Sequence, residues 1–196
     1  MDILGQQISG IELSGTAFGI AGVWLTVRKN WLCFPAGLVN VGLYAVLFFR
    51  EKLYADASLQ IVYVVLLIFG WVYWRKTEAG NAFFATRTSG RLWTTLTGIC
   101  MASTLLLGTL FKNYTDASLP FLDSLLTSMS LVAQWMIAKK KLENWIIWIV
   151  ADVLYVGMYI YKNLYLTSIL YFIFILLAIK GYREWKKNSA VNEAGH

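Results

Sequence analysis

Long apolar runs alternate with short charged or turn-forming segments along the whole chain. Read between their charged boundaries, these runs predict helices at residues 11–27, 31–49, 53–74, 91–111, 118–138, 143–161 and 164–185. Each run approaches the roughly 20 residues that a helix needs to cross a bilayer. The pattern therefore predicts an all-α polytopic membrane protein with seven transmembrane helices.

The connections between the predicted helices are short, with one exception. The segment "RKTEAGNAFFATRTSG" separates the third and fourth helices and is rich in Gly, Asn, Thr and Ser. We expect few of its side chains to pack. We also expect residues 188–196 to form a flexible C-terminal tail, because chain ends are ordered only where something holds them.

Composition agrees with a membrane protein. Of the 196 residues, 58% are hydrophobic and 14% are charged, whereas about 25% are charged in a typical soluble domain. Both cysteines lie in apolar runs, which favours free, buried thiols over a disulfide. The only histidine is His196, so we expect no histidine-based metal or proton chemistry, and we predict no cofactor.

The net charge of +6 arises from short basic clusters between the apolar runs. With the N-terminus outside, 13 of the 17 basic residues fall on the cytoplasmic side, as the positive-inside rule requires. The other four are Arg50, Lys52, Lys112 and Lys162. The distribution predicts an outer N-terminus and a cytoplasmic C-terminus, and no nucleic-acid partner.

The chain contains an internal repeat. The third and seventh predicted helices match at an offset of 111, at Leu53-Tyr54 and Leu164-Tyr165, Leu59 and Leu170, Gly70 and Gly181, and Trp74 and Trp185. The helices before them open with Asn30-Trp31 and Asn144-Trp145, at an offset of 114, which predicts a first copy about three residues longer in the middle.

Two parallel three-helix units joined by one linker helix would explain this repeat. Such a 3+1+3, SWEET-like layout relates the units by an axis along the membrane normal. The units are residues 1–76 and 116–187, with a cytoplasmic loop and the linker helix at residues 77–115. Substrates of repeat-built transporters bind near the midplane, between the units.

The sixth predicted helix carries polar and aromatic side chains on one face. Helical spacing groups Trp145, Trp148, Asp152, Tyr155 and Tyr159. Asp152 lies on the order of 13 Å from the start of this helix, near the middle of the membrane. A carboxylate at that depth is costly and usually marks a functional site.

Three other helices carry similar stripes. The fifth has Asp123, Thr127, Ser130 and Gln134, the third has Gln60, Tyr63, Trp71 and Trp74, and the second has Asn40, Tyr44 and Phe48. These stripes predict a water-accessible central site. The first helix instead spaces Gly15, Gly19 and Gly22 for close helix contact.

Structural roles compete with this interpretation at individual positions. Trp71, Trp74 and Trp185 lie near cytoplasmic helix ends, where indoles anchor at the membrane interface; we expect this role for Trp74 and Trp185, and it is an alternative for Trp145. Asn40 and Gln60 suit hydrogen bonds between helices. Thr127 and Ser130 suit bonds to their own helix backbone.

The predicted central residues favour one kind of ligand. Indole faces attract cations, a carboxylate adds direct charge complementarity, and flat rings stack on indoles. Carboxamides suit hydroxyl or amide groups. The site therefore predicts a planar, positively charged heteroaromatic molecule, such as a pyridinium or a thiazolium compound.

The segments "ENWIIWIVAD", "KLYADASLQIVY", "GWVYW" and "PFLDSL" resemble the PnuC family of bacterial vitamin transporters. The resemblance covers nearly the whole chain and the 3+1+3 layout. It implies that the W-x-x-W residues Trp145 and Trp148 lie in the substrate site, together with Asn40, Gln60 and Asp123.

The resemblance also implies a substrate and a setting. The main family substrate is nicotinamide riboside, and close relatives carry thiamine or, in a few cases, riboflavin. The family is associated with homotrimers in the lipid of the bacterial inner membrane, and with facilitated diffusion followed by phosphorylation of the vitamin in the cytosol. Some members have asparagine at the position of Asp152, so the question of which vitamin this chain carries stays open.

Alternating access about a central site is the mechanism that we expect, without ATP hydrolysis, because no G-x-x-x-x-G-K-[ST] loop occurs. Proton uptake by Asp123 or Asp152 is an alternative.

Two other classes of protein are disfavoured. A retinal photoreceptor with Lys180 is disfavoured because Lys180 lies near the basic helix end, where lysine snorkels. An intramembrane hydrolase is disfavoured because neither aspartate sits in a glycine-rich motif. We therefore expect no enzyme activity.

Overall fold

The computed structural model describes residues 2–3, 6–7, 10–50, 54–77, 83–115 and 118–189. Its helices are α1 (Gly10–Val27), α2 (Cys33–Arg50), α3 (Tyr54–Thr77), α4 (Gly90–Tyr114), α5 (Pro120–Ala138), α6 (Asn144–Tyr161) and α7 (Tyr165–Lys187). The two-residue strands β1 (Asp2–Ile3) and β2 (Gln6–Gln7) pair antiparallel before α1. Apart from this short hairpin the predicted all-α class is confirmed, with every helix boundary within about three residues of its prediction.

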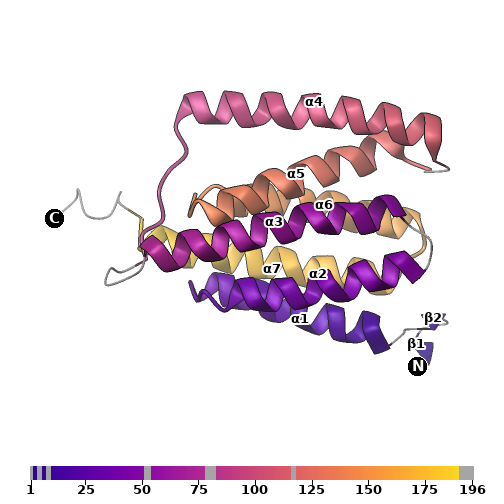
Figure 1. The fold of residues 1–196 in the computed structure, drawn as a ribbon, viewed down its shortest axis with the longest axis horizontal. Helices are drawn as coiled ribbons and strands as arrows, with labels where there is room; N and C mark the ends of the chain where they lie inside the picture. Colours follow the sequence, from indigo (N-terminus) through magenta and orange to yellow (C-terminus); the bar gives the residue numbers. More distant parts are fainter. Residues whose placement is uncertain are drawn as a thin grey trace.

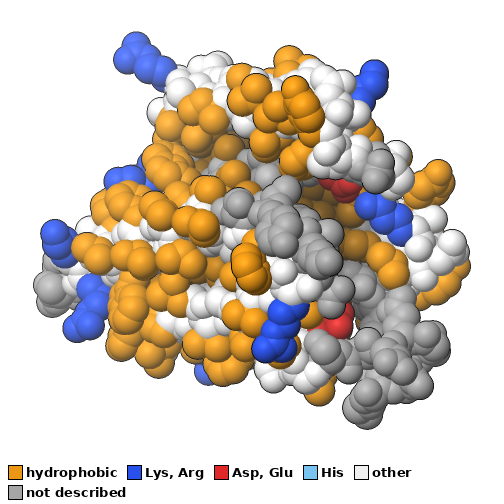
Figure 2. All heavy atoms as spheres, turned by 45° about the vertical axis from the view of Figure 1, so that its right-hand side comes forward, with side chains coloured by type: hydrophobic (Ala, Val, Ile, Leu, Met, Phe, Trp, Pro, Cys, Tyr) orange, Lys and Arg blue, Asp and Glu red, His pale blue; other side chains and the backbone are white. Residues whose placement is uncertain are grey.

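Six of the seven helices are long and apolar enough to cross a membrane, and these are α1 to α6. The seventh, α7, carries Lys180, Arg183, Glu184, Lys186 and Lys187 in its last turns. Large hydrophobic side chains stay exposed on the helices, and they cover much of the face shown in Figure 2. Exposed apolar surface on this scale needs lipid or protein to cover it. The chain is a multi-pass membrane protein.

Six of the helices form a closed ring. Around the ring, α1 contacts α2, α2 contacts α3, α3 contacts α5, α5 contacts α6, α6 contacts α7, and α7 contacts α1. Helix α4 lies outside this ring and contacts α5 (Figure 1). Gly108 permits that contact, since a methyl group there would overlap the ring of Phe121. The contacts among the other six helices give the order α1, α2, α3, α5, α6, α7 around the ring.

Glycines bring α1 close to α2, as their spacing predicts. A methyl group on Gly15 would lie 3.0 Å from the Tyr44 ring, and one on Gly19 would lie 3.1 Å from the Asn40 amide nitrogen. At Gly22 the nearest atoms belong to the α2 backbone, at 3.7 Å. The expected close helix contact is confirmed.

The helices α1, α3, α5 and α7 all end on one side of the bundle, which we call the basic end. Both turns that leave it for the next ring helix contain a lysine with left-handed backbone, Lys29 (φ 58°) and Lys140 (φ 54°). In each turn the residue after the lysine donates to a carbonyl five residues earlier, from Asn30 to Leu25 and from Lys141 to Met136. This is the Schellman pattern that closes a helix C-terminus.

Trp74 and Trp185 are not interface anchors. Both are 0% exposed, and each donates its indole N–H across a helix boundary. Trp74 Nε1 lies 3.2 Å from the Ile137 carbonyl oxygen, and Trp185 Nε1 lies 3.0 Å from that of Thr26. We call these two hydrogen bonds the clamps, because one joins α3 to α5 and the other joins α7 to α1.

An aromatic cluster made of Phe34, Trp74, Phe83, Trp145 and Trp185 fills the basic end. Phe34 meets Trp74 edge-on at 5.1 Å and 87°, and Trp145 meets Trp185 at 5.4 Å and 89°. Phe34 packs on Gly70 and Trp145 on Gly181. These contacts recur at a constant offset of 111. The prediction of an offset of 114 is wrong, because Phe34, not Trp31, takes the place of Trp145.

The segment between α3 and α4 packs more than its composition predicts. Residues 83–88, which we call the strap, cross the basic end, with Phe83 in the aromatic cluster and Ala85 fully buried. The start of the expected flexible tail is also held: Asn188 accepts a hydrogen bond from Lys29 (2.6 Å), and Ser189 is 2% exposed. Both expectations are wrong for these residues. Residues 190–196 lie outside the described part.

Candidate functional site

Asp152 is the buried carboxylate at the centre of the predicted site. It lies about 12 Å along α6 from Asn144, at a rise of 1.5 Å per residue, and it is 3% exposed. No lysine or arginine in the described part of the chain forms an ion pair with it. A buried charge without a counter-ion is expensive, so this position favours a positively charged ligand.

Three phenol rings, the tyrosine cluster, lie beside Asp152. Tyr155 and Tyr159 stack at 5.9 Å and 13°, and Tyr171 of α7 lies 4.5 Å and 5.2 Å from them. The Asp152 carboxyl lies near the phenol groups of Tyr155 and Tyr171. Helical spacing explains this grouping on α6, since residues three, four and seven apart share a face.

Helices α3 and α5 reach the same place through Tyr63 and Ser130. Ser130 is 3% exposed, and its hydroxyl lies near the phenol groups of Tyr63 and Tyr155. The structure thus brings together side chains from α3, α5, α6 and α7 near Asp152. Whether Ser130 bonds to its own helix backbone, the structural alternative, stays a prediction.

The two W-x-x-W residues differ in burial. Trp145 is 1% exposed and is enclosed in the aromatic cluster, with its indole N–H unpartnered. Trp148 is half-buried and packs against the larger hydrophobic core to which Trp145 belongs. Neither face of the Trp145 ring is open in this conformation, so stacking of a ligand on Trp145 stays a prediction that requires the basic end to rearrange.

Asn40 and Tyr44 of α2 contact α1. The Asn40 amide donates to the Gly15 carbonyl at 2.7 Å, and the Tyr44 hydroxyl lies 3.2 Å from that of Thr16. Hydrogen bonds of this kind hold transmembrane helices together. The contacts match the structural alternative for Asn40, and a substrate role for either residue stays a prediction.

The remaining predicted site residues are spread over the bundle. Asp123 lies in the first turn of α5 and pairs with Lys162 at 3.6 Å. Trp71 stacks on Trp31 at 6.1 Å and 11°, and its indole N–H is buried without a hydrogen-bond partner. Gln60 and Thr127 are half-buried. Their predicted roles in binding stay predictions.

Tyr171 is the site residue that sequence reasoning missed. No polar stripe marks α7, so periodicity gave no reason to select it. The repeat did carry a signal, because Tyr171 lies 111 residues after Gln60, which was selected. Carrying each selected position across the repeat would have found it.

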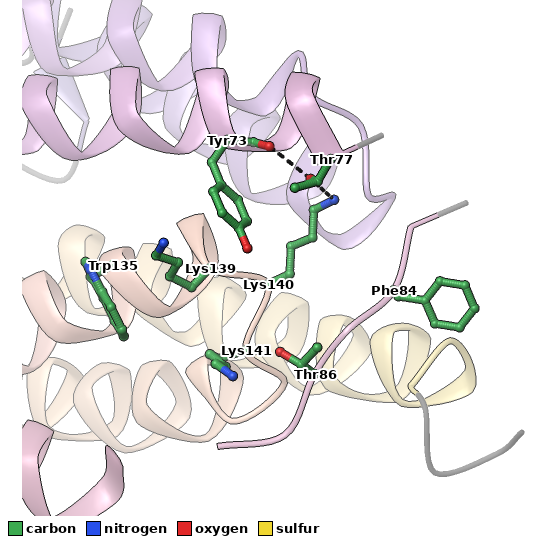
Figure 3. Close-up of a pocket in the computed structure, with 8 residues that line it drawn as sticks. All are labelled: Tyr73, Thr77, Phe84, Thr86, Trp135, Lys139, Lys140 and Lys141. Carbon is green, nitrogen blue, oxygen red and sulfur yellow. Dashed lines mark hydrogen bonds between the residues drawn. The ribbon is translucent and has the colours of Figure 1, made fainter. Parts of the chain in front are cut away.

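Two cavities lie at the basic end. One, of about 440 Å³, is lined by Tyr73, Thr77, Phe84, Thr86, Trp135, Lys139, Lys140 and Lys141 (Figure 3). In it Lys140 points to Thr77, to which it donates at 2.8 Å. The other, of about 510 Å³, is lined by Val27, Arg28, Lys29, Lys180 and Glu184. Neither contains a predicted central residue, so the water-accessible central site stays a prediction.

The side chains near Asp152 can bind and orient a ligand. Phenol faces attract cations, and the carboxylate supplies an opposite charge. Among the described residues no cluster of three histidine, cysteine or carboxylate side chains could hold a metal ion. The arrangement is suited to recognition of a cation without covalent chemistry.

Comparison with known proteins places this chain among transporters. The family model described as "Nicotinamide mononucleotide transporter" matches residues 9–187. The nicotinamide riboside transporter PnuC of Escherichia coli (strain K12) is 27% identical, with 92% of this chain and 87% of that protein covered. The riboflavin/roseoflavin transporter RibM of Streptomyces davaonensis is 23% identical, with 92% and 86% covered.

A solved structure has the same fold. It is the crystal structure of the vitamin B3 transporter PnuC, which superposes with a TM-score of 0.72 at 24% sequence identity. The match covers 90% of this chain and 80% of that one.

Proposed function

This chain belongs to the nicotinamide mononucleotide transporter family, and we propose that it takes up nicotinamide riboside across the bacterial inner membrane by facilitated diffusion. Two relatives, covered over 87% and 86% of their length, are named as transporters of nicotinamide riboside and of riboflavin or roseoflavin. The vitamin is trapped after entry by phosphorylation in the cytosol.

The observation that carries the proposal is the buried, uncompensated carboxylate of Asp152. Nicotinamide riboside contains a pyridinium ring with a full positive charge, which Asp152 would neutralise. The tyrosine cluster would offer ring faces to the same cation. Thiamine is the second candidate, because its thiazolium ring carries the same charge and Asp152 does not distinguish the two.

Alternating access follows from two units that rock about a fixed site. We take the units to be residues 1–76 and 116–187, with residues 77–115 as loop and linker, in a 3+1+3 layout. The constant offset of 111 supports this: the clamps, the glycine contacts and the lysine turns all recur at that spacing. The position of α4 outside the ring also suits a linker.

The setting of the transporter completes the proposal. The N-terminus lies outside and the C-terminus in the cytoplasm, so that the basic end faces the cytoplasm. The molecule assembles as a homotrimer in the membrane lipid. The apolar outer side of α4, where Leu105 and Leu106 are 57% and 62% exposed, is available to lipid or to another subunit.

Uptake into proteoliposomes tests the proposed function. We expect purified protein to equilibrate radiolabelled nicotinamide riboside across the membrane without any ion gradient, while liposomes without protein stay empty. Calorimetric titration with nicotinamide riboside, thiamine and riboflavin in parallel measures which vitamin binds.

The titration and the uptake assay each have a result that would contradict the proposal. Binding of thiamine without binding of nicotinamide riboside would replace the proposed substrate. Uptake that appears only when a proton gradient is imposed would contradict facilitated diffusion and support proton uptake by Asp123 or Asp152.

A further inference from the structure

The strap is hydrogen-bonded at two places to the second three-helix unit, residues 116–187, and to the residue that follows it. On one side, Ala85 N donates to the Asn188 carbonyl at 3.1 Å, just after α7. On the other, Thr86 N donates to the Lys140 carbonyl at 2.9 Å and Leu142 N donates to the Thr86 carbonyl at 3.0 Å. The strap therefore joins the end of α7 to the α5–α6 turn.

A carboxylate fixes the far end of the strap. Glu143 Oε2 accepts hydrogen bonds from the Thr88 backbone N–H at 2.9 Å and from the Thr88 hydroxyl at 2.7 Å. Glu143 lies directly before α6. Hydrogen bonds to an ionised group are stronger than those between neutral groups, so this contact ties the strap to the second unit.

Phe83 occupies the place between the two units. Its ring centroid lies 5.1 Å from that of Trp74 and 4.8 Å from that of Trp185. Since Trp74 and Trp185 are equivalent residues at the offset of 111, Phe83 lies between matched positions of the two units. In the part of the chain that the structure describes, Phe83 has no counterpart of its own.

The Phe83 ring lies against both of the indoles that donate the clamp hydrogen bonds. The indole that meets Phe83 on one side belongs to the α3–α5 clamp, and the other indole belongs to the α7–α1 clamp. These two helix pairs are the places where the two units touch in the ring. Any movement that parts the units at the basic end must break the clamps and free Phe83.

We propose that the strap is a latch that holds the basic end of the bundle closed through Phe83, and that its release opens the path from the central site to that end. The proposal rests on the proposed transport function for its purpose, but the latch itself is a property of the closed bundle. It can be tested without any substrate.

Alkylation of a natural cysteine reports opening of the basic end. Cys33 starts α2 there and is 5% exposed, whereas Cys100 lies in α4. In full-length protein with Cys100→Ser, we expect Phe83→Ala to speed the reaction of Cys33 with N-ethylmaleimide at least about tenfold, since the open state becomes more populated. The rate is measured by mass spectrometry.

Phe84→Ala is the matched control. Phe84 is the next residue and is 40% exposed, and in the cavity that it helps to line its ring points away from the lysines (Figure 3). We expect it to leave the Cys33 rate unchanged. Equal rates in Phe83→Ala and Phe84→Ala would overturn the latch. A failure of nicotinamide riboside uptake by the parent protein would overturn only the transport function.

A second experiment locks the strap instead of loosening it. Ala85 and Ser189 pair in a β-bridge, so the double variant Ala85→Cys/Ser189→Cys can be oxidised to a disulfide, in a background with Cys33→Ser and Cys100→Ser. We expect oxidation to stop vitamin uptake and a reductant to restore it, while each single variant ignores the oxidant. Full cross-linking with unchanged uptake would contradict the proposal.

Discussion

At the scale of single residues, the sequence predicts what periodicity and depth can define. Asp152 was predicted as a buried carboxylate because a charge deep in an apolar run is rare, and the structure places it 3% exposed. Whether an indole is buried or lies at the membrane interface is harder to predict. Trp74 and Trp185 have the same sequence context as interface anchors. What distinguishes them is that each donates a hydrogen bond to a carbonyl distant in sequence, that of Ile137 or that of Thr26.

Replacing Asp152 with asparagine tests its proposed contact with the cation. We expect Asp152→Asn to weaken binding of nicotinamide riboside roughly 10- to 100-fold, since a hydrogen bond or pair involving a buried charge contributes about 1.5–3 kcal/mol. Binding of uncharged riboflavin, where detectable, should not weaken. The measurement is calorimetric titration of both ligands.

Asp123→Asn serves as the matched variant. Asp123 already pairs with Lys162 and is about a quarter exposed, so its loss should cost less affinity than that of Asp152. Equal losses in the two variants, or an equal loss for riboflavin, would contradict a specific role for Asp152 in charge recognition.

At the scale of helices, the length of each element follows from the sequence because the bilayer thickness sets how long an apolar run must be. The strap does not follow from it. Its residues have no helical or strand period, and Phe83 packs only because Trp74 and Trp185 meet from separate units. The offset of 114 failed for a similar reason, since matching Asn-Trp letters concealed the geometric match of Phe34 with Trp145.

Two glycines test the equivalent helix contacts. A methyl group on Gly181 would lie 2.5 Å from the Trp145 ring, and one on Gly70 would overlap the ring of Phe34. We expect Gly181→Ala and Gly70→Ala each to destabilise the protein by about 1–3 kcal/mol, as overpacking does. Thermal unfolding in detergent measures the change.

Gly157→Ala is the control for this pair. Gly157 lies in α6 with nothing within 4 Å of an added methyl group, and alanine favours a helix by roughly 0.5–1 kcal/mol over glycine in water-soluble proteins. Its melting temperature should hold or rise. A fall as large as that of Gly181→Ala would show that the loss comes from helix flexibility and not from the aromatic cluster.

At the scale of the whole molecule, one asymmetry links charge to function. The ring is built from matched halves, yet the strap crosses one end only, and 13 of the 17 basic residues belong to that end. If the positive-inside rule holds, the latch closes the cytoplasmic side. A vitamin arriving from outside would then reach Asp152 past the tyrosine cluster before the strap releases.

Reporter fusions measure that orientation. We expect green fluorescent protein at the C-terminus of the full chain to fluoresce and alkaline phosphatase at the same place to stay inactive, because the positive-inside rule predicts that the basic end faces the cytoplasm. A phosphatase fused after Arg50, where α2 ends at the opposite side, should be active. The reverse pattern would place the strap outside, and its release would then admit the vitamin instead of delivering it.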